Sequence, residues 1–238
     1  MEVYLNHIDG VDDAIISMFL SKRTLTRELE NEIRQEVKNC SAAGSGRLKD
    51  PTDKLQDWLR KLFKWGVQHI TMLRFIDLSF SVYGLHRAGQ DDLDSHAMRM
   101  NNRIIRSSTR LADFSSGEMS SYYEGKIVTT DQALAALGIE LPEILEVGGS
   151  QYVRGVNGYI LKGMEKNKDV KRGLYMLSIP SNFIFRINLT EFAHVYKERN
   201  KDSGANPEVK RAVENMVDSL EEMSAGFINR DLLMAIKN

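Results

Sequence analysis

Hydrophobic positions recur at two spacings along the chain, one typical of helices and one typical of strands. In residues 24–39 an aliphatic side chain appears at every fourth position, which predicts an amphipathic helix capped by Thr24. A similar stripe follows Asp50-Pro51, where proline favours the first turn of a helix. Further helices are expected over residues 11–20, 90–109, 188–199 and 207–223.

Segments rich in β-branched and aromatic residues predict strands; these are residues 1–6, 69–84 and 179–188. Between residues 126 and 166 the pattern predicts a short strand, a helix capped by Thr130 and a second helix after Pro142. The small, polar segment 40–51 is expected to be a loop. Helices around a modest sheet indicate an α+β fold, and the absence of a low-complexity linker favours a single domain over residues 1–238.

Composition narrows the classes of function. The 238 residues carry a net charge of −1 and are 42% hydrophobic, a globular balance that argues against disorder and against general attraction to nucleic acid or anionic membranes. Cys40 is the only cysteine, so an intramolecular disulfide and a cysteine metal cluster are excluded. The N-terminus lacks a signal-peptide pattern, and no apolar run approaches about 20 residues. We therefore expect a cytoplasmic protein with neither a membrane nor nucleic acid as its partner.

Four arginines occur at intervals of four, three and four residues, which would place them on one face of a helix. They are Arg99, Arg103, Arg106 and Arg110. Guanidinium groups suit bidentate recognition of phosphate, although a charge run is also typical of a solvated helix face. The last of them opens RLADFSSGEMSSYY, residues 110–123, where serine hydroxyls and N–H groups near Gly117 could complete a phosphate cradle. Glu118 could accept a hydrogen bond from a base or ribose, or remain an exposed carboxylate.

A second polar set occurs late in the chain: Arg172, Asn188, His194 and Arg199. Asn188 stands where a predicted strand meets a predicted helix, so it would also serve as an N-cap. His194 lies among apolar neighbours, and Arg199 lies near the expected helix C-terminus, where a surface arginine is common. No histidine stands at a spacing that pairs Cys40 or a serine with a base, and there is neither a P-loop nor a dinucleotide-binding glycine motif.

Together these two sets resemble the flavin-dependent thymidylate synthases. That family carries the pattern R-H-R-x-x-S-x-N-E-x-S-x-R-Y, which matches at five positions when it is laid without gaps on residues 110–123. The matches are Arg110, Ser115, Glu118, Ser120 and Tyr123. Leu111-Ala112 replaces the family's His-Arg pair, Gly117 replaces its asparagine, and Tyr122 replaces its last arginine.

Other segments follow the same family in order. Four late residues fall at its spacings: Arg172, Asn188, His194 and Arg199. Ala205–Val209 resembles the segment that follows them in the family. Upstream, His69 corresponds to the first histidine of the H-x-S-x-x-E-H motif, whose Glu-His is lost here, and Arg87 corresponds to the arginine of G-x-S-R. The interval from Arg87 to Arg110 is longer than in the family.

The resemblance implies an α+β fold with a central, mostly antiparallel sheet flanked by long helices, assembled as a homotetramer with shared active sites. It implies FAD, reduced by NADPH, and transfer of a one-carbon unit from 5,10-methylenetetrahydrofolate to C5 of a uridine nucleotide without a protein nucleophile. The residues assigned to the pyrimidine nucleotide are Arg110, Glu118, Ser120, Arg172 and Arg199. Those assigned to the cofactor are His69, Arg106, Ser115, Asn188 and His194.

The departures from the family pattern keep other interpretations open. Leu111-Ala112 cannot donate the hydrogen bonds of the family's His-Arg pair, and losing one charge-assisted hydrogen bond typically costs about 1.5–3 kcal/mol. We therefore expect a divergent enzyme that acts on dUMP or a close variant. The alternative is a non-catalytic or altered-specificity protein that binds nucleotides or nucleic acid on the same scaffold. A third interpretation is a helical interaction module whose polar residues all lie on the surface.

Overall fold

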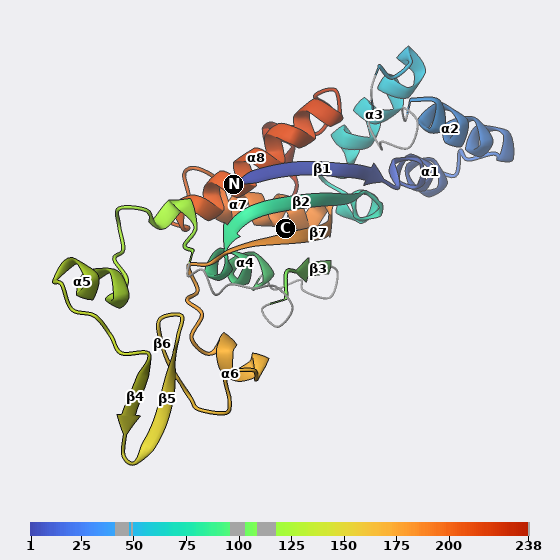
Figure 1. Cartoon of the computed structure of the whole chain (residues 1–238). Coiled ribbons are helices and arrows are strands. Elements are labelled where there is room, and N and C mark those ends of the chain that lie inside the picture. The colour runs from blue at the N-terminus through green and yellow to red at the C-terminus, as the bar shows by residue number, and fades with distance from the viewer. Residues whose placement is uncertain (41–47, 49, 96–102, 109–117, 238) are drawn as a thin grey trace. The chain divides into compact units, whose positions relative to one another are not determined.

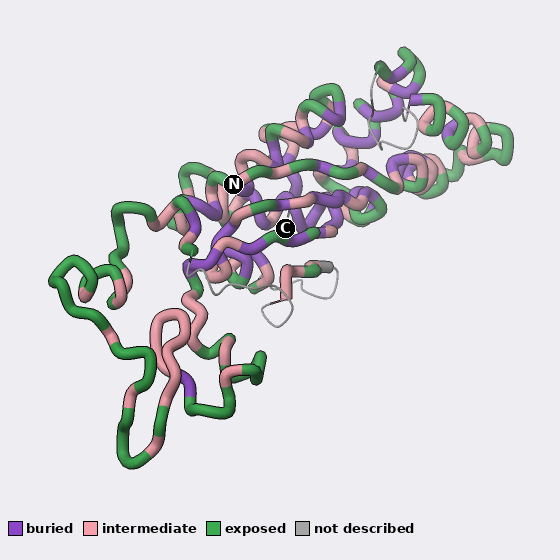
Figure 2. Tube along the Cα trace, in the orientation of Figure 1, coloured by how far each residue is buried: buried purple, intermediate pink, exposed green. Residues whose placement is uncertain are grey.

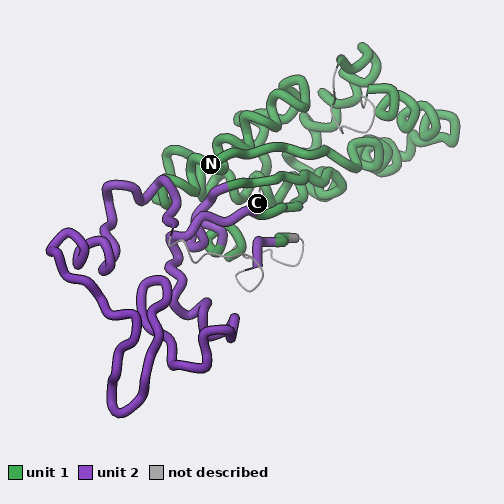
Figure 3. The backbone as a smooth tube through the Cα atoms, in the orientation of Figure 1, with its two compact units in different colours: residues 1–83, 91–105, 183–238 green, residues 84–90, 106–182 purple. Residues whose placement is uncertain are grey.

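The computed structural model describes the chain except residues 41–47, 49, 96–102, 109–117 and 238. The described chain forms two compact units (Figure 3). Unit 1 comprises residues 1–83, 91–105 and 183–238, and unit 2 comprises residues 84–90 and 106–182. The expectation of a single domain over the whole chain remains a prediction. None of the helices in the described ranges is long and apolar enough to cross a membrane.

A four-stranded sheet has the strand order β1-β2-β7-β3 (Figure 1). Its strands are β1 (Glu2–Asp9), β2 (Asp77–His86), β7 (Pro180–Asn188) and β3 (Arg103–Arg106). β1 and β2 are antiparallel, and Asp9 lies opposite Asp77. Every second residue of β7 from Ser181 to Ile187 is buried, because successive side chains of a strand point to opposite faces of the sheet.

The core of unit 1 lies against the helices of its C-terminal part, α7 (Leu189–Arg199), α8 (Pro207–Met223) and α9 (Arg230–Ala235). α8 packs against β1 and α7, and α7 also packs against α9. Phe80 of β2 stacks on Phe192 of α7 with ring centroids 5.2 Å apart, and both side chains are fully buried. Figure 2 shows that buried positions concentrate in these strands and helices. The expected α+β architecture with an antiparallel sheet is confirmed.

The N-terminal helices form a second packed group within unit 1. They are α1 (Val11–Ser21), α2 (Arg27–Cys40), α3 (Asp53–Gly66) and the 3-10 helix η1 (Ile70–Phe75). α1 contacts the other three and starts after Gly10, whose φ of 73° is in the left-handed region. A Cβ at Gly10 would lie 2.0 Å from the carbonyl oxygen of Phe75. Glycine is therefore required where β1 turns into α1 beside η1.

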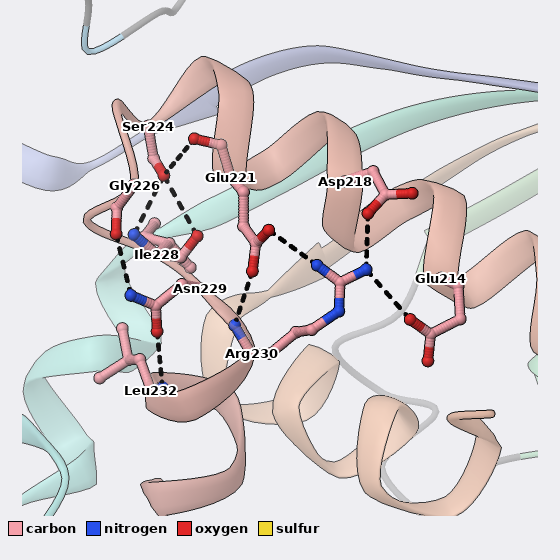
Figure 4. Close-up of polar contacts among 9 residues, drawn as sticks. All are labelled: Glu214, Asp218, Glu221, Ser224, Gly226, Ile228, Asn229, Arg230 and Leu232. Carbon is pink, nitrogen blue, oxygen red and sulfur yellow. Dashed lines mark hydrogen bonds and ion pairs between the residues drawn. The ribbon is translucent and has the colours of Figure 1, made fainter. Parts of the chain in front are cut away.

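Arg230 joins the start of α9 to α8 (Figure 4). Its guanidinium donates to the carboxylates of Glu214, Asp218 and Glu221 at 3.1, 2.5 and 2.7 Å. These three carboxylates share one face of α8 because they are four and three positions apart. The hydrogen bond to Asp218 is the main cause that raises the pKa of Arg230 further above its usual value. The charged guanidinium therefore connects the start of α9 to three carboxylates of α8.

Unit 2 contains a three-stranded antiparallel sheet of β4 (Ile144–Val147), β5 (Ser150–Gly155) and β6 (Gly158–Leu161), in that order. Gly148 and Gly149 both have positive φ, as a two-residue turn between paired strands commonly requires. α5 (Thr130–Ala136), α6 (Lys168–Arg172) and the 3-10 helix η2 (Ser121–Tyr123) lie in the same unit. α4 (Arg87–Asp94) starts in unit 2 and ends in unit 1.

The structure corrects the helix expected over residues 90–109. α4 ends at Asp94, and residues 103–106 form strand β3. Ile104-Ile105 gives this segment two β-branched side chains, which favour a strand over a helix. The arginine interval therefore does not define one helical face, and Arg99 and Arg110 lie outside the described residues.

Other element boundaries are also corrected. The segment after Pro142 forms strands β4 to β6 instead of a helix, because turns at Gly148-Gly149 and at Val156-Asn157, where Asn157 also has a positive φ, connect the paired strands. No strand forms at residues 126–129, and residues 70–75 are η1, so the strand expected over 69–84 begins only at Asp77. The caps shift as well: Thr26 accepts from the N–H of Leu29, and Thr129 forms a capping box with Gln132.

Candidate functional site

Asn188 ends β7 and caps α7, the helix that carries two other residues of the late polar set. Its Oδ1 accepts hydrogen bonds from the N–H groups of Thr190 and Glu191, both at 3.1 Å, and from the Thr190 hydroxyl at 2.7 Å. Asparagine is a preferred N-cap because this oxygen satisfies N–H groups that have no partner within the helix. A ligand contact by Asn188 would therefore have to come from its amide nitrogen.

α7 groups this cap with two more of the predicted site residues. His194 and Arg199 lie five residues apart on the helix and are both partly exposed. α7 packs against η1, and His69 is the residue that precedes η1. The exposed His69 ring meets the Trp65 ring edge-to-face with centroids 5.0 Å apart. Unit 1 thus places His194 and Arg199 on one helix, Asn188 at the cap of that helix and His69 at the start of an adjoining element.

A carboxylate from α4 holds Arg199. The Nε of Arg199 donates to Oδ2 of Asp92 at 3.1 Å, and its Nη2 donates to Oδ1 at 2.9 Å. Two parallel bonds of this kind are typical of strong arginine–carboxylate pairs. The Arg199 and Asp92 side chains are 20% and 31% exposed, so salt and water screen this pair less than a pair on the open surface. The arginine expected to hold the nucleotide is therefore already engaged within unit 1.

Ser120, in unit 2, is buried with a relative exposure of 1%. Its hydroxyl accepts from the N–H of Tyr122 at 3.4 Å, where η2 begins, and its own N–H donates to the carbonyl of Ser178 at 2.8 Å. Ser120 therefore stabilises the turn into η2. Glu118, two residues earlier, is exposed.

Tyr122 stands where the resembled family has an arginine, and it belongs to an aromatic cluster. The buried ring of His86 stacks on Tyr122 with centroids 6.1 Å apart and meets Tyr123 edge-to-face at 5.1 Å. The Nζ of Lys126 lies 3.6 Å from the centroid of the Tyr122 ring. A cation over an aromatic face is attracted by the ring quadrupole, so the ammonium group of Lys126 lies beside the position where the resembled family has an arginine.

The remaining predicted residues are on the surface or undescribed. Arg172 ends the short helix α6, with its Nη1 3.5 Å from Oδ1 of Asp169 in an exposed pair, which contributes little to stability. Arg106 ends β3 and is partly exposed. Arg110 and Ser115 lie outside the described residues.

Unit 2 also contains a cavity of about 590 Å³, lined by residues of α5, β5, β6 and α6. Its volume suits a small molecule. The charged lining includes Arg154, which donates to Asp131 and to the carbonyl of Leu141, both at 3.3 Å. None of the ten predicted site residues lines this cavity. It is therefore separate from the residues that the sequence patterns singled out.

The only cysteine has the environment of an unreactive thiol. Cys40 is 7% exposed, and burial, followed by the nearby charges of Asp50 and Glu36, raises its pKa above the usual value. The thiolate is the nucleophilic form of cysteine. A raised pKa therefore makes Cys40 unsuitable as a catalytic nucleophile at neutral pH.

Asp92 is the residue at this site that the sequence patterns did not identify. It lies 107 positions from Arg199 in the chain, so no local spacing links the two. The only available signal is the acidic pair Asp91-Asp92 in α4, a few residues after the recognised Arg87. An acidic pair on a short helix is usually a solvated surface feature.

No family model matches the sequence, and no curated protein sequence matches it. The similarity is structural. Two crystal structures of the flavin-dependent thymidylate synthase ThyX from Helicobacter pylori, complexed with FAD and dUMP, match with TM-scores of 0.55 and 0.56 at 13% and 14% identity. The alignments cover 98% of this chain and 99% and 100% of those chains. The chain has the fold of the flavin-dependent thymidylate synthases.

A methylase structure also aligns with this chain. The crystal structure of the UMP/dUMP methylase PolB from Streptomyces cacaoi, bound with 5-Br dUMP, aligns with a TM-score of 0.54 at 13% identity, over 99% of this chain and 95% of PolB. The expected resemblance to the ThyX fold is thereby confirmed along nearly the whole chain. At this level of identity the match establishes the fold, and the roles assigned to individual residues stay predictions.

Proposed function

We propose that the chain is a flavin-dependent enzyme that transfers a one-carbon unit from 5,10-methylenetetrahydrofolate to C5 of a uridine nucleotide, converting dUMP to dTMP or performing a close variant. The observation that carries this proposal is a ThyX fold over 98–99% of the chain, in which Asn188 caps helix α7 and His194 and Arg199 lie on it. NADPH would reduce the FAD. A single cysteine fits the reducing cytoplasm as the place of action.

The donor groups on the described residues fit phosphate-bearing ligands in chemical type. Arg199, Arg172 and Arg106 offer guanidinium groups, and His194 offers an imidazole. Lys126 adds a cation beside the position of the family's last arginine. Guanidinium and ammonium groups favour phosphate oxygens as hydrogen-bond acceptors. This donor set supports FAD and a nucleotide as ligands.

The roles follow the resemblance residue by residue. The nucleotide would contact Arg110, Glu118, Ser120, Arg172 and Arg199, and the cofactor would contact His69, Arg106, Ser115, Asn188 and His194. Ser120 would act mainly by shaping the turn, since its hydroxyl already accepts a bond from Tyr122. Asn188 would donate from its amide nitrogen while its oxygen caps α7.

The chain's own residues would bind and orient the reactants. When bound, the reduced flavin would supply the hydride and the folate would supply the carbon. Proximity and orientation can account for a large part of a rate enhancement without a covalent step on the protein. The raised pKa of the buried Cys40 agrees with a route that uses no protein nucleophile.

Assembly into a homotetramer with shared active sites is part of the proposal. Unit 2 exposes large apolar side chains, including Leu137 at 73%, Val128 at 67% and Leu177 at 62%. Where such groups form a contiguous patch, they commonly mark a surface that another protein covers. Size-exclusion chromatography with light scattering should give a mass about four times the 27.1 kDa of one chain, and a monomer at micromolar concentration would contradict shared active sites.

A second candidate is a protein that binds nucleotides without catalysis on the same scaffold. The observation that favours it is the ion pair between Arg199 and Asp92, together with Leu111-Ala112 in place of the family's His-Arg pair. This protein would bind dUMP, retain no flavin and release no methylated product.

The deciding experiment is the visible absorption spectrum of the purified protein before and after adding FAD and desalting. A retained flavin spectrum is expected, followed by transfer of labelled carbon from the folate to dUMP in the presence of NADPH. Arg199→Gln should reduce this transfer strongly and leave the fold intact by circular dichroism. A colourless protein that binds dUMP would favour the second candidate. Binding of polynucleotide with a steep salt dependence, and of neither FAD nor dUMP, would contradict both.

A further inference from the structure

We propose that Asp92 is an internal competitor for Arg199, so that the phosphate of a nucleotide binds there only by displacing a carboxylate of the same chain. The inference rests on the proposed role of Arg199 toward the nucleotide and goes beyond it. It assigns a specificity-determining function to a residue outside the recognised motifs.

The geometry of the pair is that of a ligand in a bidentate site. A guanidinium has five N–H groups, and the edge formed by Nε and one Nη is a preferred edge for carboxylate and phosphate. Asp92 occupies this edge, with its two oxygens 3.1 and 2.9 Å from Nε and Nη2. Nη1 donates to the carbonyl of Glu198 at 3.1 Å. A phosphate cannot use the same edge while Asp92 remains there.

The position of Asp92 is not explained by the stability of α4. Three carboxylates, Asp91, Asp92 and Asp94, lie in the C-terminal half of this eight-residue helix, and its last turn contains no basic residue. Negative charges near a helix C-terminus oppose the macrodipole and destabilise the helix. The favourable partner of Asp92 is therefore Arg199 of α7, and the pair contributes a negative charge where a phosphate would approach.

The consequence is a weaker affinity for anions than an unopposed arginine would have. A carboxylate beside a phosphate adds like-charge repulsion in a partly buried place, where charges are poorly screened. This repulsion does not act on the uncharged parts of the ligand. The site would thus discriminate among ligands by how strongly their anionic group competes with Asp92.

The test compares Asp92→Asn with the wild-type chain and with Asp91→Asn, which removes the same charge from the neighbouring position. Calorimetric titrations use dUMP, deoxyuridine and inorganic phosphate. Asparagine keeps the shape and an acceptor oxygen, so folding is preserved. Asp92→Asn should tighten binding of dUMP and of phosphate by about tenfold or more, leave deoxyuridine unchanged and exceed the effect of Asp91→Asn. Adding Arg199→Gln to Asp92→Asn should abolish the gain, since the gain acts through the arginine.

The outcomes separate this inference from the proposed function. Equal or weaker dUMP binding by Asp92→Asn, with dUMP bound by the wild type, would overturn the inference and leave the proposed function standing. Tighter phosphate binding that depends on Arg199, with no dUMP bound by either protein, would support the inference and contradict the proposed function. An equal gain in affinity from Asp91→Asn would show that the gain comes from the change in net charge, and would overturn the inference.

Discussion

The guanidinium of Arg230 lies 2.7 Å from the carboxylate of Glu221 and connects α9 to the end of α8 (Figure 4). Two further carboxylates of α8 share the same guanidinium. Arg230→Gln would leave three acidic groups facing one another without the cation. Because the Arg230 side chain is 35% exposed, we expect a loss of about 1–2 kcal/mol in the free energy of unfolding, between the values for surface and buried charged bonds.

Urea unfolding at neutral pH measures this loss, and Arg211→Gln is the matched control. Arg211 is exposed on α8, so its replacement should change the free energy of unfolding by less than about 0.5 kcal/mol. Equal stability of the two variants would contradict the structural role of Arg230.

The cap at Asn188 can be separated from its proposed contact with the cofactor. Asn188→Ala should lower the free energy of unfolding by about 0.5–2 kcal/mol, because α7 loses the acceptor for its first N–H groups. Asn188→Asp keeps that acceptor and removes the amide donor. We expect Asn188→Asp to be close to wild type in urea unfolding and weaker in FAD binding by absorbance titration. Unchanged FAD binding in Asn188→Asp would limit Asn188 to the capping role.

Gly10 and Gly226 both have positive φ, at 73° and 78°, but their surroundings differ. A Cβ at Gly10 would clash with the carbonyl of Phe75, whereas one at Gly226 would meet no atom within 4 Å. Gly226→Ala should cost about 1–2 kcal/mol from the backbone conformation alone. Gly10→Ala should cost clearly more, since β1, α1 and η1 would have to move apart. Thermal unfolding of both variants measures the two losses of stability. A larger loss for Gly226→Ala than for Gly10→Ala would contradict the close approach of Gly10 to Phe75.

Cys40 should react slowly with a thiol reagent in the folded protein at pH 7 and faster as the pH rises. Burial raises the pKa of the thiol, so the thiolate is scarce in the folded state at neutral pH. As the pH rises, the Cys40 thiol therefore loses its proton in the unfolded chain, from about pH 8.5, before it does so in the folded protein. The contribution of Cys40 to the free energy of unfolding is fully present below that pH and decreases above it.

Reaction rates with a disulfide reagent between pH 7 and 9.5, with and without urea, check this prediction. Cys40→Ser should remove the reaction and flatten part of the alkaline loss of stability. Rapid reaction of the folded protein at pH 7 would show that the thiol is accessible and ionised, and would reopen its role as a nucleophile.

Much of the α-helical structure could be predicted from short-range patterns. The helices over 11–20 and 207–223 depend on apolar spacing, and the second also on a proline in its first turn; these features lie within the helix itself. Errors occurred where two structures satisfy the same local pattern. The segment after Pro142 has apolar residues that suit either a helix or a strand, and pairing among β4, β5 and β6 decided for strands.

For the candidate site, sequence patterns singled out Asn188, His194 and Arg199 because these residues recur at recognisable spacings in a known family. They also indicated the cap at Asn188, since a capping residue acts on the N–H groups of the next few residues. The pairing of Arg199 with Asp92 and the contacts of Arg230 with α8 were not predictable, since each joins elements whose contact depends on how the chain packs.

The sequence by itself determined the amphipathic helices, the strands β1 and β7, the exclusion of an intramolecular disulfide in a chain with one cysteine, and the resemblance to a fold. These features depend on neighbours within a few positions or on the order of motifs. Only the tertiary structure decided that Asp92 occupies the binding edge of Arg199 and that Tyr122 packs against His86. Such contacts bring together residues from separate elements, so their energies arise only when those elements pack.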